Sequence, residues 1–531
     1  MHFYTKFTKD RCFPSQKYQS PIYLYIRLIV LLESYHLYVD YSFFLLLIEK
    51  KYAKICFFDI LLLFLHAVFI YKNGAMLESI TVENIFCFKN NATLSFLAGK
   101  ERNRNTDEQY CGFTTVNKQN ILKQVYIYGN NGAGKSKFLR SFSIFLQILL
   151  RPNKEKTEKL PYFPFAFDEK CQTLPSSVSA VFNIGDARYR YSLKWNASRL
   201  IEEKIELLKA QTSLVLLART IDDDVVALLD NRKLGLSAKD KDIIKRDVLV
   251  NSSILSYVPI KNIENQILNE IAIYLSNGFR FVKLETVNLP DSLPDDSNPS
   301  KRVLKRVILD VLKSVDTNIR GYEIFEVKPE LPQEIIDMFK DKPEMISAFL
   351  RGLPKHAINT LHEVQAKRLM PLPLEDQSEG TKEILRLLVV LNDAVTKNRM
   401  VILDDFSSGI QRSSLREILK FFLGIDKFGQ FVIATQDYSF LESDLVRRDS
   451  VRLAVKDEFG VSQIENLSLK DIHKNLSLPK YLSSSNKFGQ LPRIDPEIVE
   501  KTISLINRIA ADAADYNPLS DEDKDNEDIE V

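Results

Sequence analysis

The amino-acid sequence predicts an α/β fold with an antiparallel side sheet, a helical insertion and an additional apolar segment at the amino terminus. Three observations lead to this prediction. Residues 126–137 place a glycine-rich turn between a short apolar strand and a helix with regularly spaced apolar residues. Residues 400–405 form an apolar strand that ends in two acids. Residues 178–207 are typical of three antiparallel strands, with a glycine turn at 185–186.

Size and composition set the outer limits. The chain has 531 residues, of which 45% are hydrophobic and 27% charged, so it can bury a sizeable core and exceeds one ordinary domain. The net charge of +2 says little about partners. The five cysteines lack C-x-x-C spacing, which argues against a zinc site or a disulfide framework. We therefore expect reduced thiols and a cytoplasmic protein.

The first 75 residues differ from the rest of the chain. They are crowded with Tyr, Phe, Leu and Ile, and residues 55–71 are almost wholly apolar except for Asp59 and His66. This run is at the short edge for crossing a bilayer, and an ionisable group inside it is costly. Three interpretations stay open: a membrane anchor, a packed hairpin, and upstream sequence that is not part of the natural protein. The third is favoured because Met76 opens a segment typical of a domain start.

The pattern along the chain predicts five segments. They are an apolar extension at 1–75, the first half of a nucleotide-binding domain at 76–235, a helical insertion at 236–354, the second half at 355–493, and a terminal helix with a disordered acidic tail at 494–531. Membrane association is expected only if the first segment belongs to the natural protein.

The glycine-rich turn fits the phosphate-binding pattern G-x-x-x-x-G-K-[ST]. Its residues are Gly129, Asn130, Asn131, Gly132, Ala133, Gly134, Lys135 and Ser136. The glycines let consecutive backbone N–H groups point into one concavity, and the start of the following helix adds a partial positive charge. Lys135 is then expected to reach the β- and γ-phosphates of a nucleoside triphosphate, while the Ser136 hydroxyl binds Mg²⁺.

The acidic strand supplies the other half of this chemistry. Asp404 is the expected partner of Ser136 at the Mg²⁺ ion, because carboxylates suit a hard cation. Asp405 is the candidate to orient or deprotonate the attacking water. Two other features are interpreted as structural. The aromatic loop at 161–168 is expected to pack against the core. The basic cluster at 301–306 is expected to be a solvated face more often than a contact to phosphate backbone.

Three further stretches carry a resemblance to a known family. They are Gln377-Ser378-Glu379-Gly380-Thr381, then Asp404-Asp405-Phe406-Ser407-Ser408-Gly409-Ile410-Gln411, and then Ala434-Thr435-Gln436-Asp437. With the phosphate loop, they make the chain similar to ABC-type P-loop ATPases of the SMC-like branch, in particular to bacterial stand-alone ATPases of abortive-infection and other antiphage systems. The likeness runs from about Met76 to about Pro492 and implies an ABC-type P-loop NTPase head.

The resemblance implies a composite site. In such ATPases the nucleotide lies between two heads, so Ser378 and Gly380 are expected to contact the γ-phosphate that a second copy binds. It implies ATP and Mg²⁺ as cofactors, and an ATP-dependent homodimer or higher oligomer. A separate effector protein is the expected partner, with DNA as a further candidate. It also assigns Gln436, with Lys135 and Asp405, to the catalytic group.

Three positions depart from the family pattern. Asp405 replaces a glutamate and is one methylene shorter, Ser407 stands where an aspartate is usual, and Gln436 replaces a histidine, so a titratable group is lost. Because a small misplacement at a reacting centre can cost about 10²-fold in rate, we expect secure nucleotide binding and slow hydrolysis.

The leading hypothesis is therefore an ATP-switched sensor or motor in an antiphage system. The first alternative is an ATP-gated DNA clamp in repair or chromosome maintenance. About 240 residues without sustained heptads separate the half-motifs, which favours a compact lobe over a long coiled coil. The second alternative is the ATPase subunit of a transporter, suggested only by the apolar amino terminus.

Overall fold

The computed structural model describes most of the chain from residue 75 onward. The described ranges are 75–99, 112–222, 225–297, 299–315, 318–328, 331–353, 355–406, 409–423, 429–437, 446–467 and 500–506. The predictions for the first 74 residues, for Ser407 and for the acidic tail lie outside these ranges. Within them, no helix combines the length and the apolar character that crossing a bilayer requires.

A six-stranded, mainly parallel sheet forms the centre of the larger of two compact units, which comprises Gly74–Val287 and Ser378–Val531. Its order is β11 (Phe279–Val282), β15 (Met400–Leu403), β16 (Phe431–Thr435), β5 (Gln124–Tyr128), β17 (Val451–Lys456) and β18 (Ser462–Asn466). The first five strands run parallel and β18 runs antiparallel to β17. Strands β5, β15 and β16 are buried along their whole length, as continuous apolar runs require.

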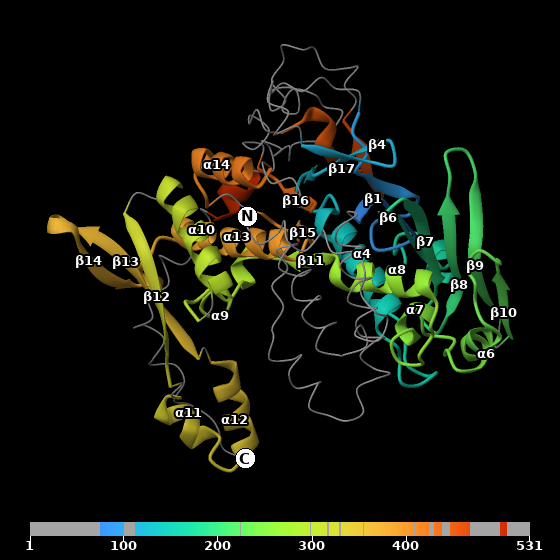
Figure 1. Ribbon diagram of the computed structural model, residues 1–531, viewed down its shortest axis with the longest axis horizontal. Coiled ribbons are helices and arrows are strands. Elements are labelled where there is room, and N and C mark those ends of the chain that lie inside the picture. Colours follow the sequence, from blue (N-terminus) through green and yellow to red (C-terminus); the bar gives the residue numbers. More distant parts are fainter. Residues whose placement is uncertain are drawn as a thin grey trace, which may run out of the picture. The chain divides into compact units, whose positions relative to one another are not determined.

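A seven-stranded antiparallel sheet belongs to the same unit (Figure 1). Its order is β10 (Val225–Asp230), β9 (Ser213–Asp222), β8 (Leu200–Leu208), β7 (Ala187–Trp195), β6 (Ser176–Ile184), β1 (Met76–Glu83) and β2 (Ala92–Ser95). The predicted side sheet is thus confirmed. Gly185 forms the turn between β6 and β7 with φ of 56°, a conformation that suits glycine. A separate hairpin, β3 (Phe113–Val116) and β4 (Gln119–Leu122), precedes β5.

The larger unit also contains helical segments, several of which contact the two sheets. They are α4 (Lys135–Leu150), α5 (Glu169–Thr173), α6 (Ala238–Arg246), α7 (Ile254–Tyr257), α8 (Gln266–Asn277), η3 (Leu284–Thr286), α13 (Glu379–Thr396), α14 (Arg412–Leu423) and η7 (Arg448–Ser450). Helix α4 contacts β16 of the parallel sheet as well as β1 and β6 of the antiparallel sheet. Helix α13 packs against β15, η3 and α14.

Aromatic contacts fix α4 between the two sheets. The ring of Phe142 meets Phe279 of β11 edge-on at 5.1 Å between centroids, and Phe145 meets Tyr191 of β7 at 6.3 Å. Both phenylalanines are fully buried. Because buried aromatic side chains contribute heavily to packing, the helix that carries Lys135 and Ser136 at its start has a rigid base.

The second compact unit contains Asn288–Gln377. Its elements are α9 (Leu289–Ser292), α10 (Pro299–Val315), β12 (Ile319–Glu326), α11 (Gln333–Met338), α12 (Pro343–Gly352), β13 (His356–Val364), η4 (Gln365–Lys367), β14 (Arg368–Pro373) and η5 (Leu374–Asp376). Strands β12, β13 and β14 pair as an antiparallel sheet. The unit starts and ends later than the predicted helical insertion at 236–354, because β11 joins the parallel sheet while β13 and β14 pair with β12.

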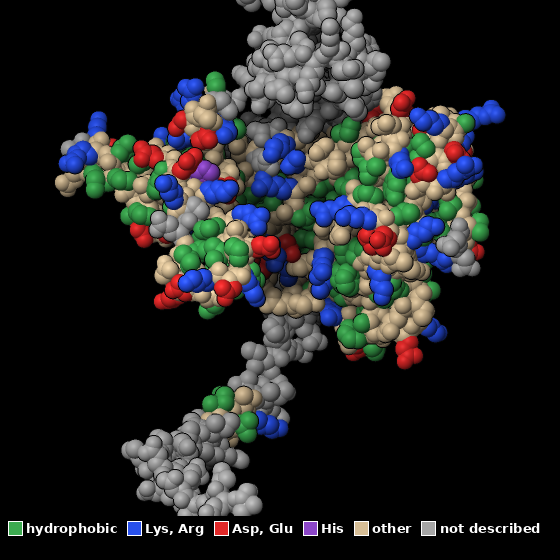
Figure 2. All heavy atoms as spheres, turned by 90° about the horizontal axis from the view of Figure 1, so that it is seen from below, with side chains coloured by type: hydrophobic (Ala, Val, Ile, Leu, Met, Phe, Trp, Pro, Cys, Tyr) green, Lys and Arg blue, Asp and Glu red, His purple; other side chains and the backbone are tan. Residues whose placement is uncertain are grey.

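Part of the surface of this second unit is apolar. Hydrophobic side chains reach the surface among charged ones in Figure 2. The most exposed large examples in this unit are Met338 at 75%, Val303 at 62%, Leu369 at 50% and Met370 at 48%. In the basic cluster, Lys301 pairs with Asp295 and Lys305 pairs with Asp296. These two lysines therefore have carboxylate partners within their own unit.

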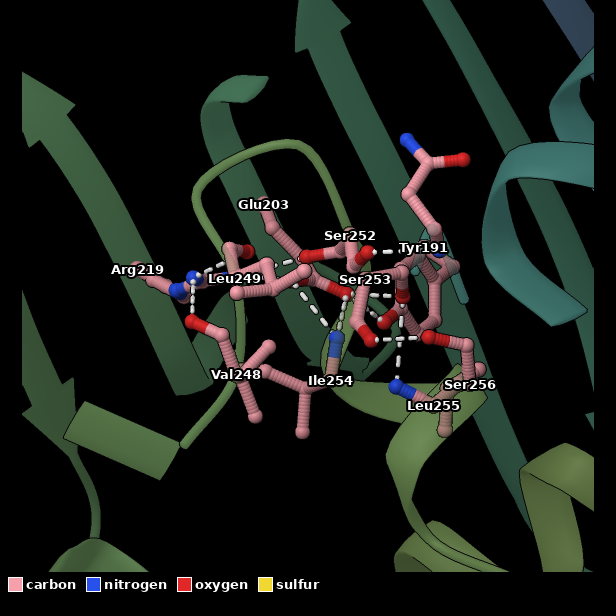
Figure 3. Close-up of polar contacts among 11 residues, drawn as sticks. Tyr191, Glu203, Arg219, Val248, Leu249, Ser252, Ser253, Ile254, Leu255 and Ser256 are labelled. Atoms are coloured by element: carbon pink, nitrogen blue, oxygen red, sulfur yellow. Dashed lines mark hydrogen bonds and ion pairs between the residues drawn. The ribbon is translucent and has the colours of Figure 1, made fainter. Parts of the chain in front are cut away.

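A buried polar network holds residues 248–256 onto the antiparallel sheet (Figure 3). Arg219 of β9 is fully buried and donates hydrogen bonds to the carbonyl groups of Val248, Leu249 and Ser252 at 2.8–2.9 Å. Its ion-pair partner is Glu203 of β8, with 3.6 Å between Nη1 and Oε2. Two opposite charges thus lie together in a buried site between strands β8 and β9 and the segment at 248–256.

Glu203 completes the network. Its carboxylate accepts hydrogen bonds from the Tyr191 hydroxyl, the Ser253 hydroxyl and the Ile254 backbone N–H, where α7 begins. Burial lowers the pKa of Arg219, and the Glu203 carboxylate raises it. Since α7 packs against α4, the network supports the helix that follows the phosphate loop.

Removing one charge from this network is expected to destabilise the larger unit strongly. Arg219→Met leaves Glu203 buried without its counter-ion and deprives three carbonyl groups of their donor, a change that costs about 3–5 kcal/mol. The control is Arg190→Met, because Arg190 pairs with Glu206 while 42% of its side chain is exposed, and such pairs contribute about 1 kcal/mol or less. Hydrogen exchange at residues 248–257 checks the prediction; equal protection in both variants would contradict it.

Candidate functional site

Three strands of the parallel sheet bring the predicted site residues to one edge. Strand β5 ends just before Gly129, β15 ends just before Asp404, and β16 ends just before Gln436. The three are neighbours in the order β15-β16-β5 and run parallel. Their carboxyl ends therefore lie at the same edge, where open α/β sheets bind ligands.

The phosphate loop has the backbone geometry that its glycines predict. Gly134 adopts φ of 104°, which a side chain would strain. At Gly129 a Cβ atom would lie 2.5 Å from the Ala454 carbonyl oxygen, so only glycine lets β5 and β17 approach there. Helix α4 begins at Lys135 without a side-chain cap. Its first N–H groups are thus available to an anion.

Lys135 reaches back over this loop. Its Nζ atom donates hydrogen bonds to the carbonyl groups of Gly129 at 2.6 Å and Asn130 at 3.1 Å. Burial lowers the pKa of Lys135, while the nearby carboxylates of Asp405 and Asp404 raise it. The ammonium group is therefore held at the mouth of the loop, facing the acidic strand.

Ser136 and Asp404 meet although 268 positions separate them in the sequence. The Ser136 hydroxyl donates a hydrogen bond to Asp404 Oδ1 at 2.9 Å. A hydroxyl and a carboxylate oxygen are hard ligands that fit Mg²⁺, and two protein oxygens leave the other coordination positions to water and phosphate, as is usual for this ion. The residues present therefore fit the expected cation.

Asp405 is held in an unusual backbone conformation. Its φ is 53°, in the left-handed region that a non-glycine residue rarely adopts. The next residue fixes it: the Phe406 N–H donates to the Ala434 carbonyl at 3.0 Å, and the Thr435 hydroxyl donates to the Phe406 carbonyl at 2.7 Å. Strain of this kind gathers at functional sites, and Asp405 lines the cavity described next.

A cavity of about 970 Å³ opens at the phosphate loop. Its walls comprise two sets of residues. The first set lies at the loop and the acidic strand: Asn131, Gly132, Ala133, Gly134, Lys135, Ser136, Lys137 and Asp405. The second set is largely aromatic: Phe86, Cys87, Tyr162, Phe163, Pro164, Ala166, Phe167, Gln172 and Lys456. A polar end and an apolar end thus share one cavity, as is common in ligand sites.

The aromatic loop at 161–168 corrects one sequence interpretation. Only Phe165 packs in the core, at 2% exposure, whereas Phe163 is 40% and Phe167 73% exposed, and both line the cavity. The ring of Phe167 rests on the turn at Gly460, where a Cβ atom would lie 2.8 Å from two ring carbons. The loop is therefore part of the site and not simply packing.

Phe86 and Phe163 form the neighbouring part of this wall. Their rings stack at 5.0 Å, and the Arg140 guanidinium lies 5.5 Å from both centroids. Lys137 Nζ lies 4.9 Å from the Phe86 ring. Each ring of this pair thus already has an aromatic and a cationic neighbour. Of the three phenylalanine rings on this wall, Phe167 offers the most accessible face.

The turn at 378–381, called the signature turn below, starts α13. The Ser378 side chain caps the helix by accepting a hydrogen bond from the Thr381 N–H at 3.1 Å. Ser378 and Gly380 do not line the cavity of their own chain, and neither does Gln436, which is exposed at the end of β16. Their assignments to a second copy's nucleotide and to catalysis stay predictions.

Sequence reasoning missed Phe86, Phe167 and Lys456 as cavity residues. Phe86 follows β1 and Lys456 ends β17, so neither carries a motif. The available signal in the sequence was the density of aromatic residues at 161–168, because aromatic side chains line ligand pockets as well as cores. The strained backbone of Asp405 had no signal in the sequence.

Comparisons with known proteins agree with the predicted class. Residues 125–442, more than half of the chain, match the family model described as "AAA domain, putative AbiEii toxin, Type IV TA system". No curated protein is similar enough to this chain to count as a match.

Several solved structures are distantly similar. The SMC head domain from Thermotoga maritima is 12% identical with a TM-score of 0.32, and the match covers 74% of this chain and 100% of that one. The SMC head bound to the C-terminal winged-helix domain of ScpA is 13% identical with a TM-score of 0.34, covering 74% and 98%. The recombination mediator RecF with ATP is 15% identical with a TM-score of 0.26, covering 68% and 94%.

Proposed function

The chain belongs to this family of AAA domains, and from that premise we propose that it is an ATP-dependent switch of a bacterial antiphage system of the abortive-infection type. Two copies bind ATP and Mg²⁺ between them, hydrolyse the nucleotide slowly and act as sensor or motor for a separate effector protein. The family description, which names an abortive-infection toxin, supports the defence role.

One observation carries the nucleotide-binding part of the proposal. Ser136 at the start of α4 donates a hydrogen bond to Asp404 at the end of β15, beside a cavity lined by the phosphate loop. This is the juxtaposition that an Mg²⁺-dependent triphosphate site requires. A chance glycine-rich turn would not place a strand-end carboxylate there.

Each residue then has a defined task. The N–H groups at the start of α4 and the Lys135 ammonium bind the β- and γ-phosphates. Ser136 and Asp404 would hold Mg²⁺, and the bound ion would supply positive charge to the phosphates. Asp405 orients the attacking water or takes its proton. Ser378 and Gly380, at a helix start, bind the γ-phosphate held by the other copy.

Slow turnover follows from three positions. Asp405 is one methylene shorter than glutamate, Ser407 provides no carboxylate, and Gln436 can donate and accept hydrogen bonds but cannot take up a proton at neutral pH. The assembled ATP-bound state is therefore long-lived. A slow switch suits a sensor, because the bound state must persist long enough for an effector to respond.

Phe167 is proposed to stack on the nucleobase at the apolar end of the cavity. Phe167→Ala is expected to raise the Kd for ATP by about tenfold, because stacking of a base on an aromatic ring contributes about 1–3 kcal/mol. Inorganic triphosphate lacks a base, so its Kd should not change. Phe459→Ala is the control, since Phe459 is also 73% exposed but does not line the cavity. Equal losses for both ligands would contradict the assignment.

The experiment that tests the function has two parts. Purified full-length protein is mixed with ATP and Mg²⁺, and its mass is followed by light scattering together with phosphate release. We expect association that requires ATP and a slow release of phosphate. Phage plating on bacteria that carry the gene with its neighbours is then compared with the Lys135→Ala variant. Equal plating on both would contradict the defence role.

A further inference from the structure

The chain segment after the acidic strand packs directly on the first turn of α13. At Gly380 a Cβ atom would lie 2.9 Å from the carbonyl oxygen of Gly409. At Gly409 a Cβ atom would lie 2.7 Å from the carboxyl carbon of Glu383 and 3.0 Å from its Oε1. Glycine at both positions therefore permits this contact, because a side chain at either position would force the two segments apart.

Glu383 forms the other side of this contact. Its Oε2 atom is buried and has no hydrogen-bond partner among the described residues. Burial raises the pKa of Glu383, whereas a hydrogen bond from the Gly409 N–H and the charge of Arg386 lower it. A carboxylate that is partly buried with an unsatisfied oxygen is costly. If the residue at position 383 served packing alone, an apolar side chain would be more stable there.

The two segments that meet here carry different parts of the proposed site. Glu383 lies one helical turn after the signature turn, which contains Ser378 and Gly380. Gly409 lies four residues after Asp405, whose left-handed backbone is fixed through Phe406. Both segments belong to the same compact unit. A displacement of α13 at its first turn therefore acts directly on Gly409, which follows Asp405 by four positions in the chain.

We propose that Glu383 is a positioning residue that couples the signature turn to Asp405 through its contact with Gly409. This inference rests on the proposed function. When the signature turn closes on the phosphate bound by a second copy, Glu383 fixes Gly409 and thereby sets Asp405 for the water. Hydrolysis then depends on completion of the composite site, and a single copy with bound ATP stays inactive.

The contact suits such a coupling because it is tight and has little freedom. Packed contacts of this kind do not deform gradually, so a shift of Glu383 displaces Gly409 as well. The distances along the chain are also short: Glu383 lies five positions after Ser378, and Gly409 lies four positions after Asp405. The carboxylate is the one ionised group in this three-residue contact.

Three variants test the proposal in the full chain. Glu383→Ala removes the carboxylate, Gly409→Ala places a methyl group where the carboxylate lies, and Glu383→Gln keeps one acceptor oxygen. We expect kcat to fall at least about tenfold in the first two, as a misplaced catalytic group implies, and to stay within about threefold of the original in Glu383→Gln. KM for ATP and ATP-dependent association are expected to stay within about twofold in all three.

The control is Glu417→Ala on α14, whose side chain is 49% exposed and pairs with Arg416; its kcat should not change. Unchanged kcat in Glu383→Ala would overturn the proposal. Lost association in that variant would also overturn it, because Glu383 would then only support the turn. A lower kcat with unchanged ATP-dependent association also shows that the variants fold. If the unmodified chain neither binds ATP nor associates, the proposed function itself fails.

Discussion

We expect Lys135→Ala to abolish ATP-dependent association and to raise the Kd for ATP by about two orders of magnitude. The ammonium of Lys135 is half-buried and donates hydrogen bonds to the carbonyl groups of Gly129 and Asn130. Few water molecules could take over these contacts once the side chain is removed. A hydrogen bond between charged groups in such a place contributes about 1.5–3 kcal/mol, and 2.8 kcal/mol corresponds to about 100-fold in affinity. Isothermal titration with ATP and Mg²⁺ measures the loss directly.

The matched control for Lys135 is Lys194→Ala. Lys194 lies in the same unit on β7, pairs with Glu202 and has 48% of its side chain exposed. We expect its Kd for ATP to be unchanged. If Lys135→Ala bound ATP as tightly as the control, the phosphate loop would not be the nucleotide site. The rest of the proposed mechanism would then have no foundation.

We expect Asp405→Asn to stop hydrolysis while leaving ATP binding intact. Asparagine fills the same volume but cannot accept the proton of the attacking water, a loss that typically costs about 10²- to 10⁴-fold. The ATP-bound dimer should therefore accumulate, which light scattering and single-turnover phosphate release detect together. The reverse change is also informative: Asp405→Glu restores the longer side chain of the family pattern and is expected to speed hydrolysis.

Two results would contradict the role of Asp405. Hydrolysis by Asp405→Asn at the original rate would show that another group orients the water. Loss of ATP binding in the same variant would show that Asp405 acts in binding or folding. Ser136→Ala provides a comparison, because the Ser136 hydroxyl donates a hydrogen bond to Asp404 and is expected to act through Mg²⁺. This variant should alter the dependence of ATP binding on Mg²⁺.

The sequence allowed the phosphate loop and its strand and helix to be predicted because their chemistry is local. A glycine at Gly134, a lysine next to it and an apolar strand before it all lie within a dozen residues. The strands at 178–207 were predictable for the same reason, since alternation and a glycine turn are short-range patterns. Asp404 was predictable only through the chemistry that Ser136 requires.

Long-range features escaped prediction. Strand β11 lies in a stretch with helical periodicity, and its place is set by parallel pairing with β15, far along the chain. Phe167 belongs to the cavity because α4 brings the following loop back beside the turn at Gly460. The meeting of Gly409 with Gly380 and Glu383 likewise depends on contacts between separate segments. The pattern of a single sequence does not show how far apart such segments lie in the folded chain.

The signature turn has its proposed task in the site of a second copy. Ser378 caps α13, and its side chain does not line the cavity of its own chain. In the proposed dimer it serves the phosphate loop of the other copy. Two inactive variants should then complement each other: Lys135→Ala lacks a phosphate-binding lysine, and Ser378→Arg blocks the turn that completes the site.

Mixing these two variants tests the central claim most directly. A mixed dimer has one site made from the intact phosphate loop of one copy and the intact signature turn of the other. Each mixed dimer has one working site where an original dimer has two, so part of the original ATPase activity, at most about half, should return. Phosphate release from the mixture, measured beside each variant alone, gives the answer. Partial recovery is the predicted result, and a mixture as inactive as its components would contradict the shared site.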